Sequence, residues 1–105
     1  MRPYRVVYTP ESSDQLAALL LHIAQRASVA VAVRYTDAVI ATCERLALFP
    51  MRGVPREDIR PGLRVTHHRG RTIIAYGVDA SAREVAVLGV FHGGQDYGVV
   101  LAAET

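Results

Sequence analysis

The sequence has no lysine, one cysteine and no long apolar run. All twelve basic residues are arginine, for which a GC-rich coding sequence is the simplest explanation. A lone Cys43 excludes an internal disulfide, which fits a reducing cytoplasm. No uncharged apolar stretch reaches the roughly 18 residues that a membrane-spanning helix needs. The N-terminal segment turns acidic at residues 11–14, before the apolar region of a signal peptide could form, so we expect no secretory leader.

The composition predicts one globular domain over residues 1–105. Half of the residues are hydrophobic and 21% are charged, which excludes a disordered chain. A chain of this length buries roughly 65% of the surface that it exposes when unfolded. That burial is enough for one hydrophobic core without disulfides.

The arginines are concentrated in one part of the chain. Between residues 52 and 71, six arginines against Glu57 and Asp58 leave a local charge of +4, whereas the whole chain carries only +2. Such a segment indicates either an anionic partner, nucleic acid or an acidic peptide, or simply a solvated loop. The six residues are Arg52, Arg56, Arg60, Arg64, Arg69 and Arg71.

The first half of the chain predicts a strand followed by two helices. Residues 4–8 are aromatic and β-branched, which favours a strand. Thr9-Pro10-Glu11 is a helix start, because threonine caps and proline suits the first turn. Ser28 predicts a break and a second cap, before a helix from about Val29 to Leu48 that Pro50 ends. The expected inward residues of these helices are Leu16, Leu19, Leu20, Ile23, Ala27, Tyr35, Val39, Cys43 and Leu46.

The second half predicts a loop and then a sheet. Two prolines and two glycines within residues 51–62 indicate a segment without regular structure. Residues 63–68, 71–78 and 84–91 read as three strands joined by short turns, which is typical of an antiparallel meander. The tail, 97–105, fits either a short strand or a helical turn. The order β-α-α-β-β-β predicts an α+β two-layer sandwich whose helical hairpin covers one sheet face and leaves the other open for a partner.

The stretch from Glu84 to Asp96 organises this prediction. Val85, Val87 and Phe91 are expected on one face of its strand, and Ala86, Leu88 and Val90 on the other. Two apolar faces are typical of a strand inside a covered sheet. The strand ends at His92 and the Gly93-Gly94 pair, so it delivers a histidine, a flexible turn and an acid to the sheet edge.

Several short strings, in this order and spacing, resemble the ParE branch of the RelE/ParE toxin superfamily. They are Tyr8-Thr9-Pro10-Glu11, Leu46 with Pro50 and Arg52-Gly53, Leu63-Arg64, Tyr76, and Val87-Leu88-Gly89-Val90-Phe91-His92-Gly93 with Asp96. The resemblance implies a bacterial toxin of a type II toxin–antitoxin (plasmid stabilisation) system. Its partner would be a cognate antitoxin, whose C-terminal segment wraps the toxin in a hetero-oligomer. ParE-type toxins act on DNA gyrase, whereas RelE-type toxins cut messenger RNA on the ribosome.

The resemblance also distinguishes between these branches. RNA cleavage needs groups that activate the 2′-oxygen and stabilise the phosphate. Arg64 occupies one basic position of RelE-like enzymes, but Ile73 stands where an arginine is expected, and Gly94 and Gln95 replace arginines common in both branches. We therefore expect a non-enzymatic gyrase inhibitor. A RelE-type endonuclease and a degenerate, non-toxic homologue that binds antitoxin remain the alternatives.

Four residues are candidates for contact with the antitoxin or the target: Arg64, Arg71, His92 and Asp96. Arg64 fits either a contact to a carboxylate or an ordinary exposed strand position. His92 and Asp96 form either an acid–base pair or a structural hydrogen bond. We expect no catalytic residue and no cofactor. We also expect no metal, because His67 and His68 alternate across the strand and Cys43 lies on an apolar helix face. Tyr76 is expected beneath the helices, and the protein in the cytoplasm, with no membrane contact and no direct nucleic-acid binding without antitoxin.

Overall fold

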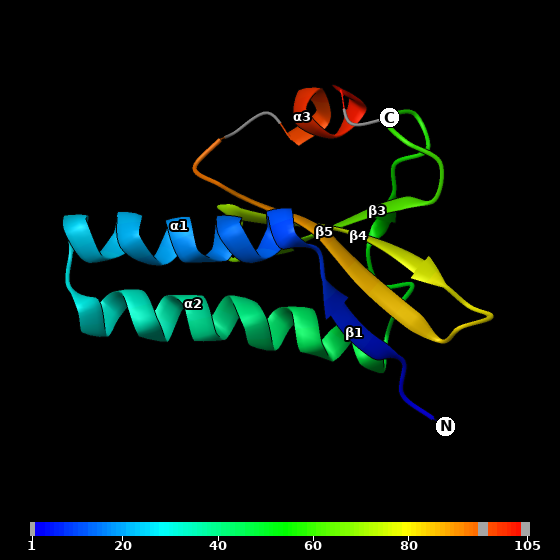
Figure 1. The fold of residues 1–105 in the computed structure, drawn as a ribbon, viewed down its shortest axis with the longest axis horizontal. Helices are drawn as coiled ribbons and strands as arrows, with labels where there is room; N and C mark the ends of the chain where they lie inside the picture. The colour runs from blue at the N-terminus through cyan, green and yellow to red at the C-terminus, as the bar shows by residue number, and fades with distance from the viewer. Residues whose placement is uncertain (1, 95–96, 104–105) are drawn as a thin grey trace.

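The computed structural model describes residues 2–94 and 97–103 and has an α+β architecture, as predicted (Figure 1). Its sheet has five strands in the order β1-β5-β4-β3-β2. In chain order the elements are β1 (Arg5–Tyr8), α1 (Pro10–Arg26), α2 (Val29–Glu44), the 3-10 turn η1 (Arg45–Ala47), β2 (Val54–Pro55), β3 (Leu63–His68), β4 (Thr72–Asp79), β5 (Glu84–His92) and α3 (Tyr97–Ala103).

Both long helices begin at the residues that the sequence predicts. The Thr9 hydroxyl accepts a hydrogen bond from the Ser12 N–H at 3.1 Å, and the Ser28 hydroxyl accepts one from the Val31 N–H at 3.1 Å. Each cap satisfies a backbone donor that the first helical turn leaves without an intrahelical acceptor. The second helix is shorter than expected, because its last turn tightens into η1 before Pro50.

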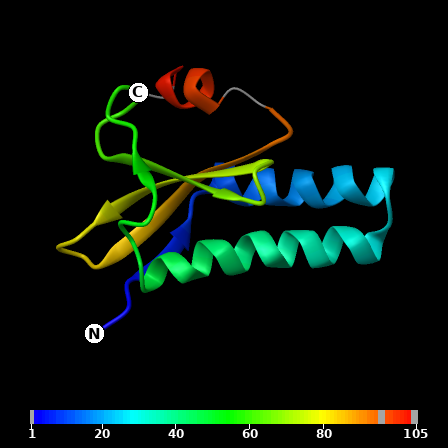
Figure 2. The same ribbon diagram turned by 180° about the vertical axis from the view of Figure 1, so that it is seen from behind.

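The two helices form an antiparallel hairpin that packs on the sheet and extends beyond it (Figures 1 and 2). Val39 and Cys43 of α2 and Leu46 of η1 are fully or almost fully buried, as expected. They join Leu16 and Leu19 of α1 in the main hydrophobic core. Burial raises the pKa of the Cys43 thiol to about 12, so this cysteine remains a protonated, apolar core residue.

The sheet is mixed rather than wholly antiparallel. β1 pairs with β5 in parallel, from Arg5 opposite Glu84 to Tyr8 opposite Val87. β5 therefore lies between β1 and β4, which confirms that it is an inner strand. The meander over β3, β4 and β5 is also confirmed. Its first turn, residues 69–71 between the paired His68 and Thr72, places Arg69 and Gly70 at φ values of +56° and +73°, a left-handed region that glycine adopts at little cost.

The prediction that residues 51–62 lack regular structure is wrong at one point. Val54 and Pro55 form β2, the edge of the sheet, opposite Val65 and Arg64. An edge strand tolerates proline because the missing N–H is not needed by a further neighbour. Composition alone could not show this pairing, since β3 supplies the partner groups.

The predicted faces of β5 are wrong in its second half. Ala75 pairs with Gly89 but Tyr76 pairs with Val87, so Leu88 is an extra residue in a β-bulge. Past the bulge the alternation reverses: Val90 packs with Val85 and Val87 beneath the helices, whereas Phe91 lies on the opposite face. The N-cap residue of α1 and a side chain of α1 satisfy the irregular backbone: Thr9 Oγ1 donates to the Leu88 carbonyl, and Gln15 Oε1 accepts from the Val90 N–H.

The sheet face opposite the helical hairpin is covered in part, not left open as predicted. The tail forms α3, which lies on that side of the sheet (Figures 1 and 2). Leu101 is 1% exposed and packs with Leu63, Val65, Ala75 and Phe91 in a second hydrophobic cluster. The residue pattern of the tail did not distinguish a strand from a helix. The packing of Leu101 on the sheet is what the sequence pattern could not show.

Within the described residues, no helix has both the length and the apolar character needed to span a membrane.

Candidate functional site

The β3–β4 turn and the end of β5 bring Arg71 and His92 together. Thr72, next to Arg71, pairs with His92 across the sheet. The Gly93 N–H donates to the Arg71 carbonyl at 3.1 Å, and Gly93 and Gly94 both have positive φ values. The turn after His92 is therefore built on residues for which left-handed backbone costs little.

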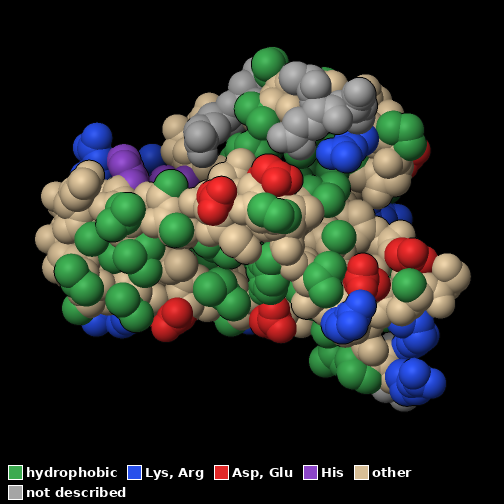
Figure 3. Space-filling view, in the orientation of Figure 1, with side chains coloured by type: hydrophobic (Ala, Val, Ile, Leu, Met, Phe, Trp, Pro, Cys, Tyr) green, Lys and Arg blue, Asp and Glu red, His purple; other side chains and the backbone are tan. Residues whose placement is uncertain are grey.

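Arg71 and His92 line a cleft of about 630 Å³ between α1 and the adjacent ends of β4 and β5. We call this the α1–β5 cleft. Figure 3 shows histidine and arginine side chains gathered above α1, on the side of the hairpin away from α2. The lining residues are Gln15, Ala18, Leu19, His22, Arg26, Arg71, Val90, His92 and Gly93, and none of them is acidic.

His92 is held in the cleft by a partly buried hydrogen-bond chain. Its Nδ1 lies 2.8 Å from Thr72 Oγ1, which lies 2.7 Å from the Tyr35 hydroxyl. The Tyr35 and His92 rings meet edge to face, with centroids 5.7 Å apart. Partial burial, and then the nearby charges of Arg71 and His22, lower the pKa of His92. His92 is thus a positioned, mostly neutral imidazole at neutral pH.

A second histidine lies on the other side of Tyr35. The ring of His68 meets the Tyr35 ring edge to face at 5.4 Å, and its Nδ1 is 2.8 Å from Thr42 Oγ1. The Thr42 hydroxyl donates its single proton to the Ala38 carbonyl, so Nδ1 of His68 is the donor in this contact. Burial, followed by the charges of Arg69 and Arg45, lowers the pKa of His68.

Arg64 lies elsewhere, and its role in the fold is structural. Its guanidinium donates to the carbonyls of Gly53, at 2.6 Å, and of Met51, at 3.2 Å. Arg64 pairs with Tyr76, four residues along β4 from Thr72, which is roughly 13 Å at about 3.3 Å per residue. The structure therefore brings Arg71 and His92 together but not Arg64. Asp96, the fourth predicted site residue, lies outside the described residues.

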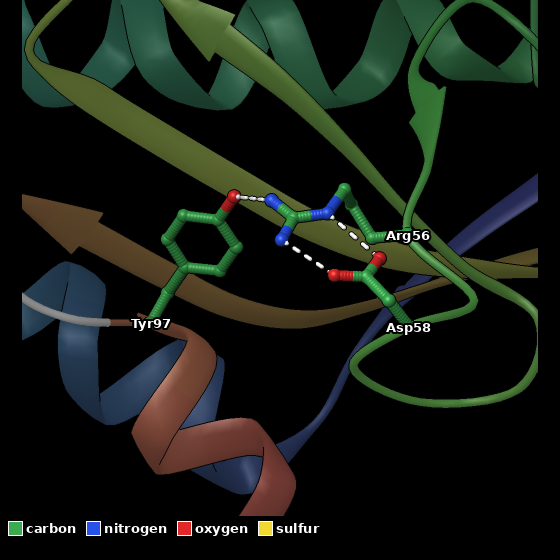
Figure 4. Close-up of polar contacts among 3 residues, drawn as sticks. All are labelled: Arg56, Asp58 and Tyr97. Atoms are coloured by element: carbon green, nitrogen blue, oxygen red, sulfur yellow. Dashed lines mark hydrogen bonds and ion pairs between the residues drawn. The ribbon is translucent and has the colours of Figure 1, made fainter.

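The face of the sheet under α3 is apolar, and Arg56 links α3 to the loop that follows β2. Ile73 of β4 packs against the second hydrophobic cluster. Figure 4 shows Arg56 between the two segments that it joins: it donates to both carboxylate oxygens of Asp58, at 3.0 and 2.9 Å, and to the Tyr97 hydroxyl of α3. This clamp ties α3 to the loop after β2.

Sequence reasoning did not identify His22, Arg26 and Thr72, and it placed Tyr35 on the inner helix face without assigning it to the site. A signal existed for the helical residues, because positions 15, 22 and 26 follow one another at helical spacing and share a face of α1. No local pattern could show that this face meets the end of β5. The predicted places of Tyr76, beneath the helices, and of Cys43, in the core, are confirmed. Among the described residues, no three His, Cys, Asp or Glu side chains form a group that could hold a metal ion.

Comparison with known proteins identifies the family. The solved structure of a chromosomal ParDE toxin–antitoxin system from P. aeruginosa has a similar fold, with a TM-score of 0.73 and 18% identity over 85% of this chain and 95% of that one. The toxin–antitoxin complex RelBE2 from Mycobacterium tuberculosis gives a TM-score of 0.66 and 24% identity over 90% of this chain and 97% of that one. The sequence matches no curated protein. The model of the family described as the ParE toxin of the type II toxin–antitoxin system, parDE, matches residues 2–97, which confirms the resemblance seen in the sequence. The chain therefore belongs to the ParE toxin family of type II toxin–antitoxin systems.

Proposed function

We propose that this toxin acts in the cytoplasm by binding and inhibiting DNA gyrase, and that a cognate antitoxin neutralises it in a hetero-oligomer. A non-enzymatic mode of action is supported by one observation: the residues that RNA cleavage would need lie apart in the structure. Arg64 is engaged by the carbonyls of Met51 and Gly53. Ile73 packs against an apolar cluster, and Arg71 lies beyond the far end of β3. A phosphate cannot contact all of these positions at once.

An exposed apolar patch supports a protein partner. Leu48, Phe49, Met51 and Val54 are each at least half exposed, and a depression of about 480 Å³ opens among Phe49, Met51 and their neighbours. Contiguous apolar surface of this kind marks interaction sites in small proteins. The structural neighbours described as ParDE and RelBE2 are toxin–antitoxin systems, which favours an antitoxin as the partner.

Expression of the chain alone, with and without the antitoxin, tests this proposal. We expect growth arrest, relaxed plasmid DNA and loss of gyrase supercoiling by the purified toxin, all reversed when the antitoxin is co-expressed. Arg34→Gln, at an exposed position of α2 outside the cleft and the patch, is the matched control and should remain toxic. Normal growth together with unaffected supercoiling contradicts the proposal.

Messenger-RNA cleavage is the second candidate, because Arg71 and His92 do lie together in the α1–β5 cleft. Primer extension after induction would then show codon-positioned cuts that Arg71→Ala abolishes. Intact transcripts in growth-arrested cells exclude it.

A non-toxic homologue is the third candidate. Gly94 stands where the resemblance expects an arginine. A Cβ built at this position meets no atom within 4 Å, so the space around it is open. Tight antitoxin binding by calorimetry without any effect on growth would favour this candidate over a gyrase inhibitor.

A further inference from the structure

The described residues that line the α1–β5 cleft present cations and hydrogen-bond donors and include no acid. Arg26 on α1 and Arg71 before β4 approach it from its two walls. Within residues 2–94 and 97–103, no acidic residue lines the cleft and no ion pair is formed by either arginine. Two permanent charges that share a concave surface raise the local concentration of anions.

The neutral polar group of the cleft is also oriented as a donor. Gln15 Oε1 accepts the Val90 N–H at 2.7 Å, so the acceptor end of this amide is occupied and its NH₂ group remains available. His22 adds an imidazole that is exposed at the rim, and its ring centroid lies 6.3 Å from that of His92. A ligand that complements this set must supply acceptors and negative charge.

The rest of the lining is apolar. Ala18, Leu19 and Val90 form a wall beside the arginines. The volume of about 630 Å³ falls within the range of small-molecule sites. A guanidinium fork matches the geometry of phosphate oxygens better than that of a monatomic anion.

We propose that the α1–β5 cleft is a binding site for a small phosphate-bearing ligand of the nucleotide class, held by Arg26, Arg71 and His22. The phosphate lies between the two guanidinium groups, and the organic part of the ligand packs against Ala18, Leu19 and Val90. This site goes beyond the proposed function, because neither gyrase inhibition nor antitoxin binding requires a small ligand.

Titration of the purified full-length chain with three probes tests the site. The probes are inorganic phosphate, adenosine monophosphate, and adenosine as the matched molecule without a phosphate. We expect saturable binding of the first two by calorimetry, tighter for the nucleotide, and none for adenosine. Imidazole NMR signals should shift, with an upward change in the apparent pKa of His92, because a bound anion offsets the positive field of Arg71 and His22.

Variants assign the binding to the cleft. Arg26→Gln and Arg71→Gln should each weaken nucleotide binding at least about tenfold, since each removes charge-assisted hydrogen bonds. Arg71→Lys keeps the charge but loses the fork, so it should bind with intermediate affinity. Arg34→Gln is the matched control and should bind as the original chain does. Circular dichroism confirms that each variant is folded.

Three results would overturn the proposal. They are the absence of saturable binding, equal binding in the Arg26, Arg71 and Arg34 variants, and binding of a single-stranded oligonucleotide when phosphate and nucleotide do not bind. The last result would make the cleft part of a nucleic-acid surface. Because the assay contains neither antitoxin nor gyrase, its failure leaves the toxin proposal unaffected.

Discussion

The hydroxyl of Tyr76 accepts a hydrogen bond of 2.7 Å from the backbone N–H of Gly53 in the protein interior. Tyr76 is fully buried in the middle strand of the sheet, and Gly53 lies in the loop that leads to β2. Arg64 holds the carbonyl of the same glycine from the other side. Both the N–H and the carbonyl of Gly53 are therefore hydrogen-bonded to side chains of the sheet, and this fixes the loop that carries the exposed apolar patch.

The Gly53 position should reject a side chain. A Cβ built there lies 2.6 Å from the Tyr76 hydroxyl oxygen and 2.9 Å from the Val65 carbonyl oxygen. We expect Gly53→Ala to lower the free energy of unfolding by about 1–3 kcal/mol, the usual cost of overpacking. Urea denaturation measures it. Gly77→Ala is the control, because its nearest contact is Leu88 Cδ1 at 3.9 Å; equal stability of the two variants would contradict the model of a clamped loop.

Val87 and Leu88 are neighbours at the β-bulge of β5 but differ in burial. Val87 is fully buried beneath the helices, whereas Leu88, the bulged residue, is half-buried on the other side. We expect Val87→Asp to cost at least about 3 kcal/mol, because it places an unpaired carboxylate in the core. Leu88→Asp should cost less, since water reaches that side chain. Thermal melts of both variants check this order. A larger loss of stability in Leu88→Asp than in Val87→Asp would contradict a bulge at Leu88.

α3 should contribute to stability through one residue. Leu101 is 1% exposed in the second hydrophobic cluster, whereas Val99 is 66% exposed. Leu101→Ala should therefore lower the free energy of unfolding by about 2–5 kcal/mol, and Val99→Ala should leave it nearly unchanged. Chemical denaturation of the two variants measures the difference. An equally small effect at both positions would mean that α3 does not pack on the sheet.

The histidines beside Tyr35 should make the protein less stable in mild acid. Burial and nearby positive charges lower the pKa of His68 and His92 below the ordinary histidine value of about 6.5. The unfolded chain then binds more protons than the folded chain as the pH falls below about 6.5, so stability decreases through that window until the folded-state pKa values are reached. Above pH 6.5 these two groups add no further pH dependence.

The surroundings of His68 explain why stability decreases as the pH falls. Nδ1 donates to Thr42, and the buried Nε2 has no hydrogen-bond partner among the described residues, so protonation would add a donor without an acceptor. Melting temperatures at pH 7.5 and 5.5 should differ less in His68→Gln than in the original chain. His67→Gln, at an exposed position of the same strand, should retain the full difference. An unchanged pH profile in His68→Gln would show that this imidazole is not responsible.

The sequence by itself determined the local features of this protein. Thr9 and Ser28 fix the helix starts because each cap acts within three residues of itself. Arg69-Gly70 is a short turn with its own backbone preference, and β5 is recognisable as an inner strand because both of its faces are apolar. The family, too, was recognisable from short strings in order.

Only the tertiary structure decided how separated segments meet. The bulge at Leu88 is accompanied by a hydrogen bond that Thr9 donates and one that Gln15 accepts, and these residues lie 79 and 75 positions earlier in the chain than their partners. β2 exists because β3 supplies its partners, and α3 because the second hydrophobic cluster receives Leu101. The same holds for the α1–β5 cleft, where packing of α1 against the end of β5 brings Arg26 and Arg71 into the lining of one cleft. Contacts between distant residues depend on the packing of whole elements, and no local pattern of residues contains that information.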